Sequence, residues 1–169
     1  TISGFFENIF QFIDSNEVDK FVLDIRLNGG GNNYLNKSAI TSIIQSKKIN
    51  RYGHLFVITG AATFSAAQNL TNELEKYTEA IFVGEPTAEN VNYWGDIKTE
   101  VLPLSNLNVN LSWLWWQNMD PRDKRQWTSP GLAAEMSFEN YKAGYDSAIN
   151  IILNYKEEKR IDEKIKNLI

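Results

Sequence analysis

The segment Lys20-Phe-Val-Leu-Asp-Ile-Arg26 and the loop Asn28-Gly-Gly-Gly-Asn-Asn33 that follows it decide the fold class. The first is a run of large apolar residues ending in charge, which is typical of a strand buried on both faces in a parallel sheet. The second is a loop whose glycines can adopt backbone angles closed to other residues. Apolar residues at helical spacing from Leu35 to Ile44 predict that a helix follows the loop.

The same alternation extends on both sides of this segment. A short amphipathic helix is predicted over Gly4 to Ile13, upstream of the first strand. A second buried strand is predicted over His54 to Gly60, a helix beginning near Ser65, and a third strand over Ala80 to Gly84. Alternating strands and helices of this kind predict a layered α/β domain built from βαβ units.

The C-terminal half of the chain has a different pattern. Apolar residues at every second position from Leu107 to Trp113 predict an antiparallel strand with one face toward water. Residues Phe138 to Lys159 are predicted to form one long helix. We therefore expect one core domain over residues 1–155, followed by a charged helical tail over residues 156–169.

Composition excludes several classes of function. The 169 residues carry a net charge of -4, which argues against a dedicated nucleic-acid binder. The chain has no cysteine and a single histidine, His54, so no disulfide scaffold, thiol nucleophile or multi-histidine zinc site is expected, and no metal or cofactor is predicted. No apolar run approaches the roughly 20 residues of a membrane-spanning helix. Because the chain begins at Thr1, we expect it to be a piece of a longer protein.

The glycine loop is the first candidate for chemistry. It fits neither the dinucleotide fingerprint, because Tyr34 stands where the third glycine belongs, nor a P-loop, because no Gly-Lys-Ser/Thr triplet occurs. Its backbone N–H groups could still face an anion, including the oxyanion of an acyl-transfer intermediate. The alternative is a tight turn that merely requires glycine.

Ser65 is the second candidate. It lies at a predicted strand-to-helix junction among small residues, in Thr63-Phe-Ser-Ala-Ala67, although Thr63 and Ala67 replace the glycines of the Gly-x-Ser-x-Gly elbow. The N–H groups at a helix N-terminus favour developing negative charge, which suits a nucleophile. The alternative is an ordinary N-cap serine. His54 precedes the second strand and is expected far from Ser65, without a catalytic role.

Four tryptophans close together in the sequence form a third feature. Such a cluster would suit a carbohydrate- or peptide-binding groove, and packing in a core or at a sheet interface explains it equally well. The cluster consists of Trp113, Trp115, Trp116 and Trp127.

Taken together, these segments resemble the S41 serine peptidases, that is, the C-terminal processing or tail-specific proteases and their tricorn-core relatives. Phe21 to Gly31 resembles their strand-and-loop signature, Thr63 to Gln68 their nucleophile motif, and Ala80 to Thr87 their Gly-Glu-x-Thr turn. Further on, three segments resemble closing segments of bacterial members of the family: Val101 to Ser105, Asp123 to Trp127 and Ser137 to Asp146. The resemblance covers roughly residues 20–153 and implies a ClpP/crotonase-like fold of stacked β-β-α units.

The resemblance also implies roles for individual residues. Ser65 matches the family's nucleophile, and the N–H of Ala66 with that of Gly30 or Gly31 matches its oxyanion hole. The Ser-Lys branch has its lysine base where this chain has Asn90. The resemblance therefore favours the tricorn-like branch, whose histidine would lie before residue 1.

Two further positions bear on this assignment. The tricorn-like branch has a downstream carboxylate, for which Asp123 is the candidate and Asp120 the alternative. An ion pair of Asp123 with Arg122 or Lys124 in a surface loop is equally compatible with the sequence. Gln68 replaces the family's acidic residue after the nucleophile motif.

Three functions follow as hypotheses. The first is a serine endopeptidase core acting on polypeptides, with its base supplied by the missing N-terminal region and little activity in isolation. The second is a family member without catalysis that keeps a peptide- or glycan-binding groove. The third is a crotonase-type acyl-CoA enzyme, which the short chain disfavours. The resemblance suggests a secreted or cell-envelope location, and an oligomer is possible.

Overall fold

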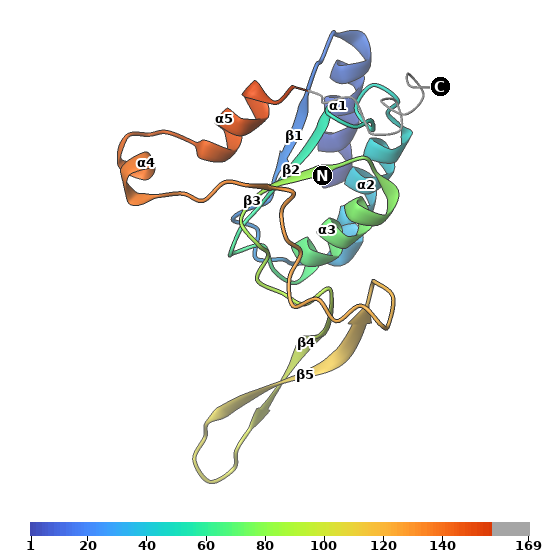
Figure 1. The fold of residues 1–169 in the computed structure, drawn as a ribbon. Helices are drawn as coiled ribbons and strands as arrows, with labels where there is room; N and C mark the ends of the chain where they lie inside the picture. Colours follow the sequence, from blue (N-terminus) through green and yellow to red (C-terminus); the bar gives the residue numbers. More distant parts are fainter. Residues whose placement is uncertain (157–169) are drawn as a thin grey trace.

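The core of the protein is a parallel sheet of four strands in the order β1-β2-β3-β6 (Figure 1). The structure, a computed structural model, describes residues 1–156. Every residue of the second strand is buried, because a strand lies on each side of it and helices cover both faces. The strands are β1 (Phe21–Asp24), β2 (Leu55–Thr59), β3 (Ile81–Gly84) and β6 (Leu132–Ala133).

Helices pack on both faces of this sheet (Figure 1). Leu55 and Val57 join a core cluster with residues of the first three helices, whereas Phe56 and Ile58 face the last helix. This alternation along one strand makes three layers. The helices are α1 (Ile2–Ser15), the short η1 (Asn33–Leu35), α2 (Asn36–Gln45), α3 (Ala66–Tyr77), α4 (Phe138–Lys142) and α5 (Ser147–Asn154). The prediction of a mixed α/β domain with a parallel sheet is confirmed.

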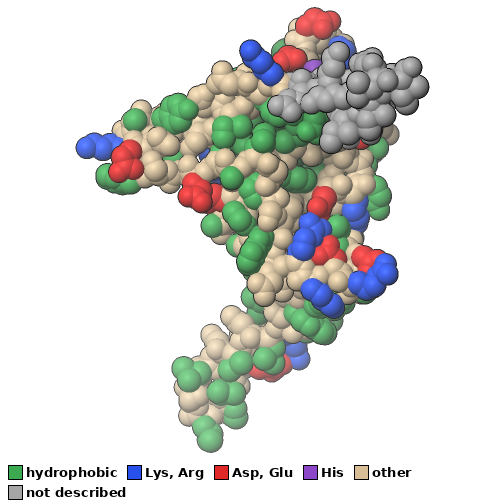
Figure 2. All heavy atoms as spheres, in the orientation of Figure 1, with side chains coloured by type: hydrophobic (Ala, Val, Ile, Leu, Met, Phe, Trp, Pro, Cys, Tyr) green, Lys and Arg blue, Asp and Glu red, His purple; other side chains and the backbone are tan. Residues whose placement is uncertain are grey.

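A two-stranded antiparallel hairpin projects from this body (Figure 1). It is formed by β4 (Asn92–Val101) and β5 (Asn108–Gln117). The predicted strand is present, but its expected burial on one face is wrong, since Leu111 and Trp113 are 50% and 63% exposed. Hydrophobic side chains gather along this arm in Figure 2. Alternation in a strand specifies two faces, and burial of one of them needs a second layer, which the described residues do not provide here.

The long helix predicted over Phe138 to Lys159 is also wrong in its described part, where two short helices replace it. The chain turns at Gly144, whose φ of +66° is left-handed. The Asp146 side chain then caps the second helix by accepting a hydrogen bond from the N–H of Ile149 at 3.0 Å. An apolar stripe at helical spacing does not reveal such a break, because both halves can keep the same spacing. The charged tail predicted for residues 156–169 lies, from residue 157 on, outside the described residues.

Candidate active site

The glycine loop and the Ser65 turn lie side by side at one edge of the sheet. They follow β1 and β2, which are adjacent parallel strands, so both segments leave the sheet at its carboxyl edge. The N–H of Phe64 donates to the carbonyl oxygen of Asn28 at 3.1 Å and ties the two segments together. The topology therefore brings the two sequence candidates into one site.

Gly30 packs directly against Ser65. A β-carbon added at Gly30 would lie 2.6 Å from the Cβ of Ser65 and 2.9 Å from the carbonyl oxygen of Phe64. Gly30 also has a φ of +104°, in the region that L side chains rarely adopt. Both the space and the backbone angle therefore require glycine at this position.

Ser65 has an unusual backbone conformation. Its φ and ψ are 56° and -121°, although it is not a glycine. Such angles cost about 1–3 kcal/mol and persist where the surrounding structure imposes them, often at functional sites. Ser65 stands at the N-cap position of α3, but its side chain makes no capping hydrogen bond. The hydroxyl thus does not play the part of an ordinary N-cap.

The backbone donors near Ser65 differ in what they already bind. The N–H of Gly30 donates to Oδ1 of Asn28 at 3.0 Å, so it is occupied. Ala66 is the first residue of α3, and its N–H therefore has no partner within the helix. The N–H groups of Gly31 and Ala66 make no hydrogen bond within residues 1–156. These two donors remain available to an oxyanion.

Thr63 anchors the turn that carries Ser65, a role that the sequence did not reveal. It is fully buried, and its hydroxyl donates to the carbonyl oxygen of Ile25 at 2.9 Å while accepting from the N–H of Gly60 at 3.0 Å. One side chain thereby links the ends of β1 and β2 to the segment that carries Ser65. The threonine in the nucleophile motif was the only signal in the sequence for this role. Its hydrogen-bond partners depend on the fold and could not be predicted from the motif.

Ser65 opens into a cavity of about 480 Å³. The glycine loop, the start of α3 and the base of the hairpin form its walls, and Tyr93 and Trp116 come from the hairpin. Burial, and then the charge of Glu89, raise the pKa of the Tyr93 phenol, although hydrogen bonds with Ser65 and Asn69 act in the opposite direction. Tyr93 is therefore protonated at neutral pH and serves as a polar neighbour of Ser65, not as a base.

Three of these cavity residues were missed by the sequence reasoning. Asn69 has a helical spacing of four from Ser65, a signal that was available. Glu89 and Tyr93 reach the cavity only because the chain folds back over the start of α3, and no local pattern indicates that.

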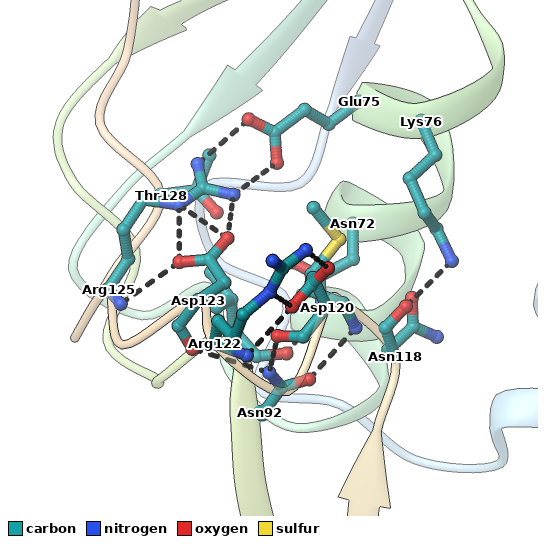
Figure 3. A network of polar contacts seen from close by, with 12 residues as sticks. Asn72, Glu75, Lys76, Asn92, Asn118, Asp120, Arg122, Asp123, Arg125 and Thr128 are labelled. Atoms are coloured by element: carbon teal, nitrogen blue, oxygen red, sulfur yellow. Dashed lines mark hydrogen bonds and ion pairs between the residues drawn. The ribbon is translucent and has the colours of Figure 1, made fainter.

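Asp123 lies in a network of ion pairs (Figure 3) and is not among the residues that line the Ser65 cavity. Arg125 contacts Asp123 at 2.7 Å and Glu75 at 2.8 Å. Glu75 is ten residues along α3 from Ser65, which corresponds to about 15 Å of helix. Hydrogen bonds from Arg125 hold the pKa of Asp123 below its usual range. The geometry places Asp123 in a structural network and does not bring it to the Ser65 cavity.

The other singled-out residues lie apart from Ser65 as well. Asp120 pairs with Arg122 on the surface, where their side chains are 2.8 Å apart. His54 precedes β2 and contacts the carbonyl oxygen of Asp19, at the opposite edge of the sheet from Ser65. Asn90 is exposed, so it faces solvent at the lysine position of the Ser-Lys branch.

Gln68 points into the body of the protein. Its amide nitrogen donates to Asn72 at 2.8 Å and to Thr128 at 3.0 Å, and the residue is fully buried. Gln68 therefore ties α3 to the segment before β6 and does not line the Ser65 cavity.

The four tryptophans of the sequence cluster lie in different surroundings in the structure. Trp116 lines the Ser65 cavity, and its indole Nε1 donates to Asp96 at 2.7 Å. Trp115 instead pairs with Trp94, with ring centroids 5.4 Å apart, and Trp113 and Trp127 are exposed. One member of the cluster therefore belongs to the candidate site.

Residues 1–156 contain neither a cluster of metal-binding side chains nor a helix suited to span a membrane. No three His, Cys, Asp or Glu side chains in this range are grouped so that they could hold a metal ion. No helix in the same range combines the length and apolar character needed to cross a bilayer.

Comparison with known proteins shows the fold. The chain is similar to a candidate S41 protease from Bacteroides fragilis, with a TM-score of 0.57 and 21% identity over 95% of this chain and 47% of that one. The chain shares its fold with S41-type proteases. A candidate peptidase from Parabacteroides merdae gives a TM-score of 0.60 and 15% identity over 88% of this chain and 55% of that one.

A third similar structure is the photosystem II D1 C-terminal processing protease, with a TM-score of 0.53 and 16% identity over 79% of this chain and 39% of that one. The chain thus spans between about two fifths and a little over half of the length of these three proteins. No family model matches the sequence, and a comparison with curated proteins gives no match either.

Proposed function

We propose that this chain is the core of an S41 serine peptidase in which Ser65 is the nucleophile. The observation that carries the proposal is the conformation of Ser65. It has a left-handed backbone, lies against Gly30, and has a hydroxyl with no capping hydrogen bond. The shared fold with S41-type proteases supports the same reading and suggests a polypeptide substrate.

The reaction would proceed by acyl transfer. The Ser65 oxygen attacks the carbonyl carbon of the scissile peptide, and its proton passes to a base and then to the leaving amine. The N–H groups of Gly31 and Ala66 would hold the oxyanion, because neither donor has a partner among residues 1–156. Loss of one such donor typically costs about 3–4 kcal/mol of transition-state stabilisation. Water then hydrolyses the acyl-enzyme and returns the proton.

The base is proposed to come from a part of the protein outside this chain. An amide cannot accept the serine proton, and Asn90 stands where the Ser-Lys branch has lysine. His54 does not serve as the base, because it lies before β2, at the opposite edge of the sheet from Ser65. We therefore place the chain in the tricorn-like branch, with ClpP/crotonase-like architecture and a secreted or cell-envelope location as parts of the same proposal.

A second candidate is a peptide-binding domain that has lost catalysis. It is favoured by Asn90 and by the absence of a histidine beside Ser65 among residues 1–156. Such a domain would still bind peptides in the cavity, and this binding would not need the Ser65 hydroxyl.

The test is covalent labelling of the full-length protein with a fluorophosphonate probe. We expect labelling that disappears in Ser65→Ala and persists in Ser112→Ala, the other serine that lines the cavity. Labelling that is absent, or that is unaffected by Ser65→Ala, would overturn the peptidase proposal and leave the binding domain.

A further inference from the structure

The cavity beside Ser65 carries negative charge without a cation. Glu89 and Asp96 both line it, and none of the described residues that line it is a lysine, arginine or histidine. Asp96 accepts the indole N–H of Trp116 at 2.7 Å, whereas Glu89 accepts, from residues 1–156, only the N–H of its neighbour Asn90 at 3.2 Å. Burial raises the pKa of the Glu89 carboxyl, as expected for an acid with no cationic partner.

A buried acceptor in the same cavity also lacks a partner. Asn69 is 1% exposed and lines the cavity, and its Oδ1 makes no hydrogen bond with any described residue. Its contact with Tyr93 therefore uses the amide nitrogen. Leaving a buried acceptor unpaired is unfavourable, and a donor group on a ligand would remove that cost.

The position of Asn69 connects this acceptor to the nucleophile. Ser65 precedes α3 and Asn69 lies four residues later, so both residues lie on the same side of the helix. A ligand whose reacting group lies at Ser65 can therefore place a neighbouring donor at Asn69.

Between these polar groups, the hairpin supplies an apolar wall. A β-carbon added at Gly95 would lie 2.9 Å from Cδ1 of Trp116, so the indole lies directly over this glycine. Ile97 continues the same wall. A wall of this kind suits an aliphatic stem, and the carboxylates suit a positive charge at its end.

We propose that this cavity is a subsite for a lysine or arginine side chain of a polypeptide, with Glu89 as its counter-charge and Asn69 Oδ1 as its hydrogen-bond acceptor. The identification of the ligand as a polypeptide rests on the proposed function above. The charge preference rests on the cavity residues alone.

The test measures peptide binding to the full-length protein carrying Ser65→Ala, which prevents turnover. The probes are acetylated and amidated pentapeptides of alanine with a central lysine, arginine, norleucine or glutamate. Calorimetry is expected to show the lysine and arginine peptides binding about tenfold or more tightly than the norleucine peptide, the effect of one charged hydrogen bond. The glutamate peptide should bind most weakly.

Two variants in this background locate the effect. Glu89→Gln should remove most of the lysine preference and leave norleucine binding unchanged. It should fold normally, because the glutamine oxygen can still accept the N–H of Asn90 that Glu89 accepts. Asn69→Ala should weaken lysine binding. Glu139→Gln, an exposed acid on α4, is the matched control and should change nothing.

The outcomes separate this inference from the proposed function. Equal binding of lysine and norleucine peptides, no binding of either, or a preference that survives Glu89→Gln would overturn the subsite while Ser65 labelling stands. Failure of Ser65 labelling together with Glu89-dependent lysine binding would overturn the peptidase and leave a cation-binding domain.

Discussion

Gly30 and Ser65 are in such close contact that the two residues form one structural unit, although 34 positions separate them in the printed sequence. The ideal β-carbon position at Gly30 is 2.6 Å from the Cβ of Ser65 and 3.0 Å from the backbone nitrogen of Ala66. The glycine loop thus packs against both the proposed nucleophile, Ser65, and one proposed oxyanion donor, the N–H of Ala66.

Gly30→Ala is expected to disable the site. The new methyl group must displace the Ser65 turn, and alanine at a φ of +104° is strained. A displacement of about 1 Å at reacting atoms typically costs about a hundredfold in rate, so fluorophosphonate labelling of Ser65 should slow by about that factor.

The neighbouring Gly29→Ala is the matched control for this experiment. A β-carbon there would meet nothing within 4 Å, and Gly29 does not have a left-handed φ. Labelling at the unchanged rate in Gly29→Ala, beside slow labelling in Gly30→Ala, would support the contact. Equal rates in the two variants would show that the contact does not position Ser65.

Thr63→Val is expected to destabilise the protein by about 1–3 kcal/mol, the cost of a buried polar group left without its partner. Valine keeps the shape but leaves the N–H of Gly60 and the carbonyl of Ile25 without the Thr63 hydroxyl. Urea denaturation measures the change in the free energy of unfolding. Thr63→Ser keeps the hydroxyl and should recover most of the loss, whereas equal losses in both variants would attribute the effect to packing.

Asp123→Asn is expected to lower stability by about 1 kcal/mol, because the Arg125 network is partly exposed to solvent. Its effect should depend on pH. Arg125 holds the pKa of Asp123 below the ordinary value of 3.8, so the ionised form stabilises the fold above that pH. The stabilisation is lost as pH falls below 3.8 through the lowered folded-state pKa, and the difference between wild type and variant should shrink there.

The same variant tests the placement of Asp123 outside the active site. Its side chain is 19% exposed and lies with Glu75 near the far end of α3. Asp123→Asn should therefore label at Ser65 as fast as the wild type. A folded Asp123→Asn protein that no longer labels would restore Asp123 as a catalytic residue.

Most of the sheet was predictable because its strands are continuous apolar runs, and β1, β2 and β3 lie within the predicted segments. β2 and β3 are buried throughout. The predicted burial of β1 on both faces is wrong, because β1 is an edge strand whose residues are half-buried or exposed. The glycine loop and Ser65 were also predictable as candidates, since both stand where a strand ends. The partner strand β4 and the break at Gly144 were not, because nothing in their local patterns separates them from their surroundings.

The sequence by itself determined the parallel α/β core and the two loops that follow β1 and β2, because these depend on local backbone preference and on the spacing of apolar residues. Only the tertiary structure decided which side chains share the cavity with Ser65. Glu89 and Tyr93 line the cavity because the chain folds back across α3. Asp123 instead lies beside Glu75, since Arg125 forms ion pairs with both carboxylates. Contacts between residues far apart in the chain depend on how whole elements pack, which no short stretch of sequence encodes.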